Sequence, residues 1–482
     1  MLHSNLIMSK AFDIDIDAFV NSSGSLTAGG PLDAAQADAA RDMSSTPGPG
    51  KSFYIETFGC QMNVHDAEKV AGVLLSRGYR AAPSIAEADF MLYNTCSIRE
   101  KAAQKVFSRL GELRGVTNKV IGVIGCLAQQ EGEDIFERAP WVSLVCGSAS
   151  YRKLPELLAQ LESGGRRVMG LDLDTSETFE TEITRRDNPI RAYLTIIEGC
   201  NYACSYCVVP HTRGPERSRS SESVLAEARR LADAGYTEIQ LLGQTVNSYR
   251  DPGPCKWSFV ELLVSVAAVE GIRRVRFTTS HPNDFHREIV EAIDSVPELC
   301  DHIHLPVQSG STRILREMRR TYTRDEYLEK ISWIRAAKRP ISITSDIIVG
   351  FPGETDDDFE QSVTLLDAAG YDGLFAFTYS PRPNTTAAAM ADAVPEKEKA
   401  TRLAILLERQ RQIQLERNEK LVGMSFEVLV DGRHEARAQW GGRTSSNRLI
   451  NFSSPRQNLL GEYINIRVSR ATANSLVGEE IA

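Results

Sequence analysis

The stretch Ala192-Tyr-Leu-Thr-Ile-Ile-Glu-Gly-Cys200-Asn-Tyr-Ala-Cys204-Ser-Tyr-Cys207 leads from a strand-like apolar run directly into three closely spaced cysteines. Further strand-like runs follow it, each ahead of a helical pattern: Glu238–Leu242, Arg274–Thr279, His302–Pro306, Ile341–Val349 and Leu374–Tyr379. Strands that alternate with helices predict a parallel sheet with helical crossovers. Over residues 187–417 the pattern predicts an incomplete α/β barrel, (β/α)6, with its active site at the carboxyl ends of the strands.

Residues 51–165 repeat this alternation and predict a separate α/β domain with a parallel sheet. Its strand-like runs, Phe53–Thr57, Phe90–Asn94 and Val120–Ile124, are followed closely by Cys60, Cys96 and Cys126. Because the carboxyl ends of parallel strands share one edge of a sheet, these three thiols should meet there. A lone cysteine is more often a small buried hydrophobe. Three equivalent placements nevertheless favour a common site.

The remaining cysteines and the composition limit the classes of protein to which the chain can belong. Cys146 follows the strand-like run Trp141–Val145 and could be a fourth ligand at the same edge, but we interpret Cys146, Cys255 and Cys300 as structural. Nine cysteines among 482 residues are too few for a disulfide scaffold. No stretch approaches the roughly 18 apolar residues of a membrane helix. We therefore expect a cytoplasmic protein.

Three further segments complete the chain. Residues 1–50 are acidic and polar, which predicts a disordered leader. Residues 166–186 are predicted to be a linker. Residues 418–482 contain several short strand-like runs and predict a small β-barrel. The net charge of −9 predicts no general affinity for nucleic acid, so RNA binding would depend on local basic groups.

The spacing of Cys200, Cys204 and Cys207 suits an iron–sulfur cluster. Three thiolates can bind three irons of a [4Fe–4S] cluster and leave the fourth iron without a protein ligand. The alternative is a closed zinc site completed by His211, four residues further on. The preceding strand and the strand–helix units that follow favour the cluster, because this loop opens a barrel.

Over nearly all of residues 51–482 the chain resembles the radical S-adenosylmethionine methylthiotransferases, and within them the MiaB-type tRNA enzymes. Gln61-Met62 departs from the ribosomal-protein enzymes of this family, in which a proline–lysine pair would be expected there. The strings that carry the resemblance are Thr57-Phe-Gly-Cys-Gln-Met-Asn63, Asn94-Thr-Cys-Ser-Ile-Arg-Glu100, Glu198-Gly-Cys-Asn201, Leu305-Pro-Val-Gln-Ser-Gly310, Asp346-Ile-Ile-Val-Gly-Phe-Pro-Gly-Glu354 and Gly442-Arg-Thr444.

The resemblance implies two [4Fe–4S] clusters, an auxiliary one on Cys60, Cys96 and Cys126 and a radical one on Cys200, Cys204 and Cys207. It implies that S-adenosyl-L-methionine (SAM) supplies both a methyl group and a 5′-deoxyadenosyl radical. The product would be a methylthio group at C2 of N6-isopentenyladenosine at position 37 of tRNA. An electron donor such as flavodoxin or ferredoxin and a sulfur donor are implied as partners, and the C-terminal barrel would be an RNA-binding TRAM domain.

Contacts to the cofactor and to RNA are predicted residue by residue. For SAM these are Tyr206, Gly243, Gln244, Ile348 and Gly350, although an apolar strand residue and a turn glycine need no functional reason. For RNA they are Arg213, Arg217, Arg437, Arg443, Asn447 and Arg448, with Arg219 in the same basic group as the first two. An arginine in a loop is, however, more often a solvated surface residue.

Two other functions remain open at this point. A relative with the same chemistry would modify threonylcarbamoyl-adenosine in tRNA or an aspartate of a ribosomal protein. A protein of another class would be a non-catalytic, zinc-containing RNA-binding protein. Counting iron, sulfide and zinc in the purified protein separates the second alternative from the enzymes.

Overall fold

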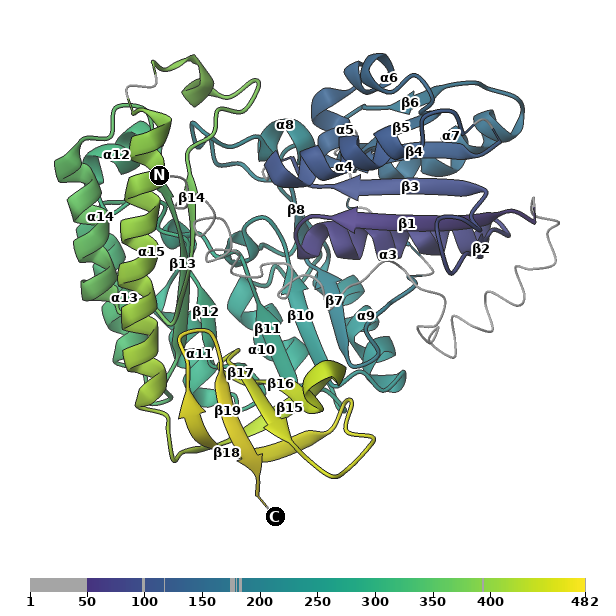
Figure 1. Cartoon of the computed structure of the whole chain (residues 1–482). Helices are drawn as coiled ribbons and strands as arrows, with labels where there is room; N and C mark the ends of the chain where they lie inside the picture. Colours follow the sequence, from purple (N-terminus) through teal and green to yellow (C-terminus); the bar gives the residue numbers. More distant parts are fainter. Residues whose placement is uncertain are drawn as a thin grey trace, which may run out of the picture.

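The computed structural model describes residues 50–481 except 98–99, 117, 174–177, 179, 182–183 and 392–393. The predicted leader therefore lies outside the described residues, apart from Gly50, and so does part of the predicted linker. The described chain forms an N-terminal α/β unit, a central unit of strands and helices, and a C-terminal barrel (Figure 1). None of its described helices combines the length and the apolar composition that a membrane crossing requires.

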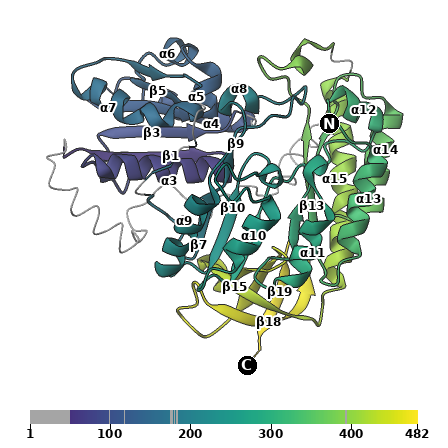
Figure 2. The ribbon, with the colours of Figure 1, turned by 180° about the vertical axis from the view of Figure 1, so that it is seen from behind.

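The N-terminal unit is a parallel sheet with the strand order β2-β1-β3-β4-β5-β6, and helices cover both of its faces (Figure 2). β3 is buried at all its positions because apolar cores form on both sides of it. The strands are β1 (Ser52–Phe58), β2 (Arg80–Ala81), β3 (Phe90–Thr95), β4 (Val120–Gly125), β5 (Leu144–Gly147) and β6 (Val168–Gly170). The helices are α3 (Gln61–Ser76), α4 (Glu100–Glu112), α5 (Cys126–Glu131), α6 (Asp134–Arg138), the 3-10 turn η1 (Ser148–Lys153) and α7 (Leu154–Glu162).

The central unit contains all of the predicted strands, in chain order. They pair as two parallel sheets, β11-β10-β7 and β12-β13-β14, and Val275 of β11 also pairs with Leu299 just ahead of β12. The strands are β7 (Arg191–Thr195), β10 (Glu238–Leu242), β11 (Arg274–Phe277), β12 (His302–His304), β13 (Ser342–Val349) and β14 (Gly373–Thr378). The helices are α8 (Val209–Arg213), α9 (Ser221–Asp233), α10 (Phe259–Ala267), α11 (Arg287–Ser295), α12 (Thr312–Glu317), α13 (Arg324–Arg335), α14 (Asp356–Ala369) and α15 (Glu396–Glu419). The predicted open α/β barrel is confirmed.

A short antiparallel hairpin, β8 (Ile197–Glu198) with β9 (Arg217–Ser218), brackets the three-cysteine loop. The backbone NH of Cys200 donates to the carbonyl of Gly214, 3.2 Å away, which closes this loop at its base. Gly199 has a positive φ of 78°, and a Cβ there would lie 2.1 Å from the carbonyl oxygen of Pro215. The Gly-Cys pair is therefore required by the crossing of these two strands.

The C-terminal unit is a closed barrel with the strand order β15-β16-β17-β19-β18. Its strands are β15 (Ser425–His434), β16 (Gln439–Thr444), β17 (Leu449–Ser453), β18 (Tyr463–Ala471) and β19 (Leu476–Glu480). It docks on the amino ends of the central strands: Arg274 and Arg276 at the start of β11 donate to backbone carbonyls of Arg443, Thr444 and Ser445. The C-terminal barrel thus lies at the end of the open barrel opposite to the cysteine loop.

Candidate active site

Cys60, Cys96 and Cys126 lie at one edge of the N-terminal sheet, at the ends of neighbouring strands. Phe58 of β1 pairs with Thr95 of β3, and Thr95 pairs with Gly125 of β4. Cys60 begins the turn into α3, Cys96 directly follows β3, and Cys126 is the first residue of α5. The register confirms that the strand ends bring the three cysteines together.

Two buried asparagines tie these cysteine turns together. The side-chain oxygen of Asn63 accepts from the backbone NH of Cys60 and lies 3.2 Å from its sulfur. Asn94 donates to the carbonyl of Asn63 at 2.6 Å, which links the α3 turn to β3. A Cβ at Gly59 would lie 2.4 Å from the Asn63 side-chain oxygen, and one at Gly125 would lie 2.5 Å from that of Asn94. The glycines ahead of Cys60 and Cys126 make room for this network.

Cys146 stands apart from this edge. It pairs with Ile124 inside the sheet and belongs to the apolar core on the α3 side. Its thiol is fully buried, lies 3.6 Å from the carbonyl oxygen of Ser150, and burial raises its pKa to about 12. These surroundings favour the structural interpretation of Cys146 over a fourth ligand.

Each cysteine of the second group has a polar neighbour that stabilises a thiolate. Arg320 lies 3.3 Å from the sulfur of Cys204, the backbone NH of Val209 lies 3.5 Å from that of Cys207, and the hydroxyl of Thr245 lies 3.7 Å from that of Cys200. Burial nevertheless raises the pKa of Cys200, and raises that of Cys207 to about 12. Binding of a metal by thiols releases such protons.

The donor set fits an iron–sulfur cluster better than zinc. Among the described residues, no three His, Cys, Asp or Glu side chains converge closely enough to hold a single metal ion. His211 is exposed on α8 and completes no such group. In a cubane each thiolate binds a different iron, so the ligands stand around a larger body than one ion. The three thiols are half-buried, have hydrogen-bond donors beside them and lie on a loop at the mouth of the barrel. This arrangement suits a cluster of several irons.

Gln244 and Gly243 support the cysteine loop from β10. The side-chain oxygen of Gln244 accepts from the backbone NH of Gly199 at 2.6 Å, next to Cys200. A Cβ at Gly243 would lie 2.2 Å from the side chain of Ile197 in β8. These contacts give Gln244 and Gly243 a structural role, which is to hold the cysteine loop in position. Their predicted contact with SAM stays a prediction.

The other predicted cofactor residues fall into two groups. Tyr206 and Ile348 pack together against Phe351 and Tyr379 in a small apolar cluster beside the cysteine loop, where an adenine could be received. Gly350 instead has a positive φ of 71° and faces the buried side chain of Lys399, 2.4 Å from where its Cβ would be. The turn and the close contact with Lys399 therefore account for a glycine at position 350, as the alternative to a SAM contact proposed.

The two cysteine groups are joined across the mouth of the open barrel. Gln61, the residue after Cys60, accepts from Gln240 of β10 at 3.1 Å and from Thr278 at the end of β11 at 3.3 Å. Inside the barrel, alternate positions of β13 are only half-buried, which is typical of a strand that lines an open space, and Asp346 at one of them lies 3.5 Å from His304. The sequence strings contained Gln61 and Asp346, but nothing in them revealed these contacts.

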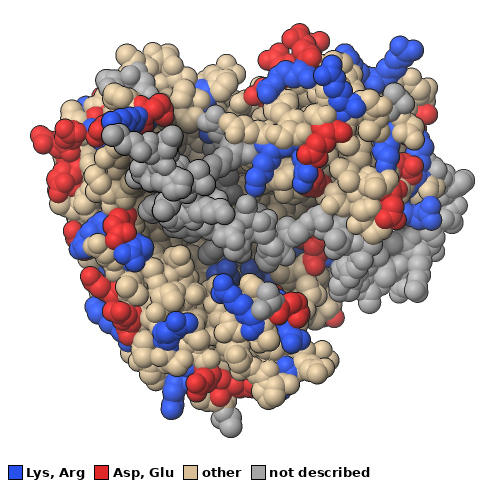
Figure 3. Space-filling model, in the orientation of Figure 1, with Lys and Arg blue, Asp and Glu red and all other residues tan. Residues whose placement is uncertain are grey.

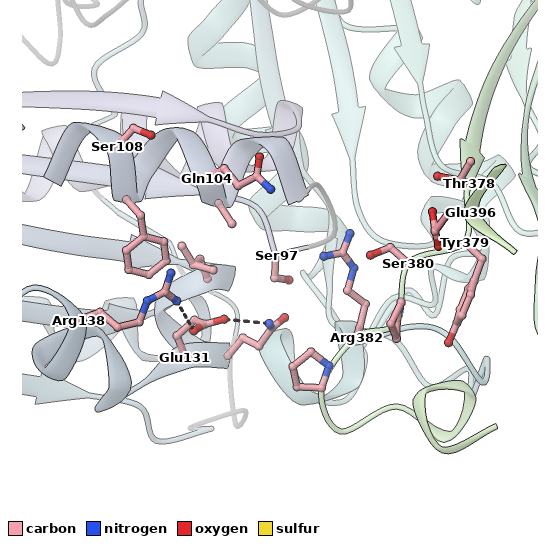
Figure 4. A pocket seen from close by; sticks show the side chains of 16 residues that line it. Ser97, Gln104, Ser108, Glu131, Arg138, Thr378, Tyr379, Ser380, Arg382 and Glu396 are labelled. Carbon is pink, nitrogen blue, oxygen red and sulfur yellow. Dashed lines mark hydrogen bonds and ion pairs between the residues drawn. The ribbon is translucent and has the colours of Figure 1, made fainter. Parts of the chain in front are cut away.

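A cleft of about 1090 Å³ opens beside this junction. One wall is formed by α4 and α5, including Ser97 and Leu127 next to the cysteines of the N-terminal sheet. The other wall is the loop that follows β14, and Figure 4 shows Arg382 extending from it toward Ser97. The cleft therefore reaches the residues that directly follow Cys96 and Cys126.

The basic group after the cysteine loop does not face solvent, which corrects the prediction that it contacts RNA. Arg213 is 6% exposed and lies 2.5 Å from Asp66 of α3. Arg217 is 10% exposed and pairs with Glu198, while Arg219 is 3% exposed and pairs with Glu227. Arg213 joins the central unit to the N-terminal unit, whereas Arg217 and Arg219 pair within the central unit. Each charge has a partner, because an unpaired charge could not be buried there.

Two of the predicted RNA contacts of the C-terminal barrel, Arg448 and Arg443, have protein partners as well. Arg448 pairs with the buried carboxylate of Asp372 and with Asn418, and Arg443 lies 3.6 Å from Asp431 and 3.3 Å from the carbonyl of Asn447. Arg437 alone of the predicted arginines is exposed. On the face shown in Figure 3, Lys and Arg side chains lie among Asp and Glu side chains.

Comparison with known proteins assigns each unit a counterpart. Residues 52–147 match the Uncharacterized protein family UPF0004, residues 194–366 the Radical SAM superfamily, and residues 419–481 the TRAM domain. The chain is 63% identical to the tRNA-2-methylthio-N(6)-dimethylallyladenosine synthase of Solibacter usitatus over 90% of its length and 98% of that protein. It is 60% identical to the protein of the same name from Koribacter versatilis, over 91% and 99%.

A solved structure supports the fold. The radical S-adenosylmethionine methyltransferase TsrM from Kitasatospora setae, solved with cobalamin and a [4Fe–4S] cluster, superimposes with a TM-score of 0.52. It covers 70% of this chain and 74% of its own, at 14% identity. This similarity extends to the arrangement of strands and helices alone.

Proposed function

This chain belongs to the family of tRNA-2-methylthio-N(6)-dimethylallyladenosine synthases, and we propose that its two groups of three cysteines hold the two [4Fe–4S] clusters of that reaction. It is a radical SAM enzyme that transfers a methylthio group to N6-dimethylallyladenosine in tRNA. The target is position C2 of the adenine at position 37. Cys60, Cys96 and Cys126 hold the auxiliary cluster, and Cys200, Cys204 and Cys207 hold the radical cluster.

The observation that carries this proposal is the convergence of the two groups. Each lies at the carboxyl ends of parallel strands, and Gln61 connects the two edges through Gln240 and Thr278. Three protein ligands leave one iron of each cluster open. When bound, the clusters and SAM supply a methyl group, an exchangeable sulfur and a carbon radical.

The chain's own residues position and enclose these groups. Arg320, Val209 and Thr245 place donors at the three thiolates of the radical cluster, and Gln244 fixes the backbone that carries Cys200. Tyr206 and Ile348 offer an apolar surface for the adenine of SAM. Asn63 and Asn94 hold the auxiliary cysteine turns. The half-buried Asp346 and His304 line the barrel where the target base enters, which requires the base to leave its loop.

The tRNA is proposed to lie along the cleft between α4 and the loop after β14, with Arg382 near its backbone. Arg437 is the predicted arginine that we retain as an RNA contact, together with the half-buried Asn447. We take residues 51–165, 187–417 and 418–482 as the functional domains. We also propose a cytoplasmic location, a flavodoxin or ferredoxin as the electron donor, and a separate sulfur donor.

Anaerobic reconstitution and product analysis test the assignment. The wild-type protein should convert tRNA that carries N6-dimethylallyladenosine to the 2-methylthio product, as judged by nucleoside mass spectrometry. Replacement of Cys146 by Ala is the matched control, because this thiol lies in the core of the same sheet. The Cys146→Ala variant should keep the iron of both clusters, whereas loss of one cluster's iron would make Cys146 a ligand.

A further inference from the structure

Arg213 crosses from the central unit into the N-terminal unit at the auxiliary site. It ends α8, six residues after Cys207, and its guanidinium lies 2.5 Å from Asp66, six residues after Cys60. α8 lies beside α5, which begins at Cys126, in both views of the ribbon (Figures 1 and 2). The hydroxyl of Ser148 donates to the carbonyl of Thr212 at 2.7 Å and fixes α8 in place.

The charges around Arg213 identify what it faces. Burial lowers the pKa of Arg213, but the charges of Asp66, Cys126, Tyr151 and Cys60 together raise it well above its ordinary value. The geometry agrees with this. Arg213 is buried and pairs with Asp66 on α3, the helix that Cys60 caps, and α8 packs beside α5, which begins at Cys126.

We propose that Arg213 is the buried counter-charge of the auxiliary cluster and that the central unit supplies it. This inference rests on the assignment of Cys60, Cys96 and Cys126 to that cluster. A [4Fe–4S] core held by three thiolates is already an anion, and it gains a further negative charge when it accepts one electron. A fixed cation in a dry site stabilises that added charge, because net charge and burial set cluster potentials. Arg213 thus makes the auxiliary cluster easier to reduce only while the two units are docked.

The carboxylate of Asp66 has the opposite effect. It orients Arg213 and partly neutralises it, so Arg213 is a positioning residue whose charge is adjusted by its partner. Arg217 completes the arrangement, because it donates to the carbonyl of Arg213 at 3.1 Å and pairs with Glu198 two residues before Cys200. One chain of contacts therefore connects the two cysteine loops.

The test is a redox titration of the auxiliary cluster in the full-length chain, monitored by electron paramagnetic resonance with dithionite as the reductant. Cys200, Cys204 and Cys207 are replaced by Ala so that a single cluster titrates. On this background we compare the parent, Asp66→Asn, and the double variant Asp66→Asn/Arg213→Gln. The two variants share a neutral residue at position 66 and differ only in the charge at position 213, so neither leaves a buried carboxylate unpaired.

Asp66→Asn should be easier to reduce than the parent, and the double variant should be harder to reduce than Asp66→Asn. We expect the second difference to be at least about tenfold in the equilibrium constant, which is 59 mV for one electron. Arg213→Lys should stay close to the parent. If the charge of Arg213 does not act on the cluster, Asp66→Asn and the double variant will have the same potential, and that result would overturn the inference. Absence of iron from the parent would instead refute the assignment of the cluster ligands.

Discussion

Gly125→Ala should disrupt the auxiliary site through the network that holds it. Gly125 has a φ of 96° and a ψ of −162°, a conformation that is essentially restricted to glycine. A Cβ there would lie 2.5 Å from the side-chain oxygen of Asn94 and 2.9 Å from the carbonyl oxygen of Thr95. The substitution therefore strains the backbone and also pushes Asn94 away from Asn63.

The magnitude follows from these two contributions. Backbone strain of this kind costs about 1–3 kcal/mol. Loss of a buried hydrogen bond costs about 1–3 kcal/mol more when its partner is left unsatisfied. A local destabilisation of about 2–6 kcal/mol corresponds to roughly 30-fold to on the order of 10,000-fold faster exchange of protected amides, since 1.4 kcal/mol is tenfold.

Hydrogen exchange of the β4 amides, followed by mass spectrometry, measures this effect. The matched control is Gly115→Ala, where φ is 91° but a Cβ would meet nothing within 4 Å. It carries the strain without the clash, so its effect on β4 should be at least about tenfold smaller. Equal effects of the two substitutions, or full auxiliary iron in Gly125→Ala with unchanged exchange, would refute the role of the asparagine network.

Other substitutions test other parts of the structure. Cys204→Ala should abolish SAM cleavage and keep auxiliary iron, whereas Cys126→Ala should keep uncoupled cleavage and lose methylthiolation; methylthio product from Cys126→Ala would exclude its role as a ligand. Arg448→Ala should lower the thermal midpoint by loosening the C-terminal barrel from Asp372, at a cost of about 1–3 kcal/mol; an unchanged midpoint with tRNA affinity lowered more than tenfold would restore it as an RNA contact. Burial, outweighing the pull of Arg186, raises the pKa of Glu68 from 4.5 to about 7 in the folded state. The stabilisation that the protonated Glu68 contributes is therefore fully present below pH 4.5 and is lost as the pH rises to 7. Glu68→Gln should flatten this part of the curve of unfolding free energy against pH. An unchanged curve would show that Glu68 does not titrate there.

The placement of the cysteines was predictable because it depends on strand order alone. Runs that end at Thr57, Asn94 and Ile124 predict three strand ends, and parallel pairing puts them on one edge. The structure extends each strand by one residue at its carboxyl end and leaves that conclusion unchanged. The α/β class and the open barrel follow in the same way.

The fate of the arginines was not predictable from the sequence. Arg213 and Arg448 resemble solvated basic residues until docking of the units brings Asp66 and Asp372, each far away in the chain, beside them. Arg443 instead pairs with Asp431 when the neighbouring strands β15 and β16 of the same barrel come together. Local sequence patterns do not reveal these pairs. β16 is difficult to predict from the sequence, because Gly441-Gly442 weakens its strand signal. In the structure a Cβ at Gly442 would lie only 2.3 Å from the carbonyl oxygen of Leu429, so the close approach of β15 requires glycine there.

Iron and acid-labile sulfide counts on anaerobically reconstituted protein test the central claim most directly. Two clusters of four irons predict about eight irons per chain in the wild type and about four in each variant that lacks one cysteine trio. The Cys60/Cys96/Cys126 and Cys200/Cys204/Cys207 variants should each keep the spectrum of the other cluster. A wild-type protein with only about four irons, or a trio whose removal leaves the iron content unchanged, would contradict the account.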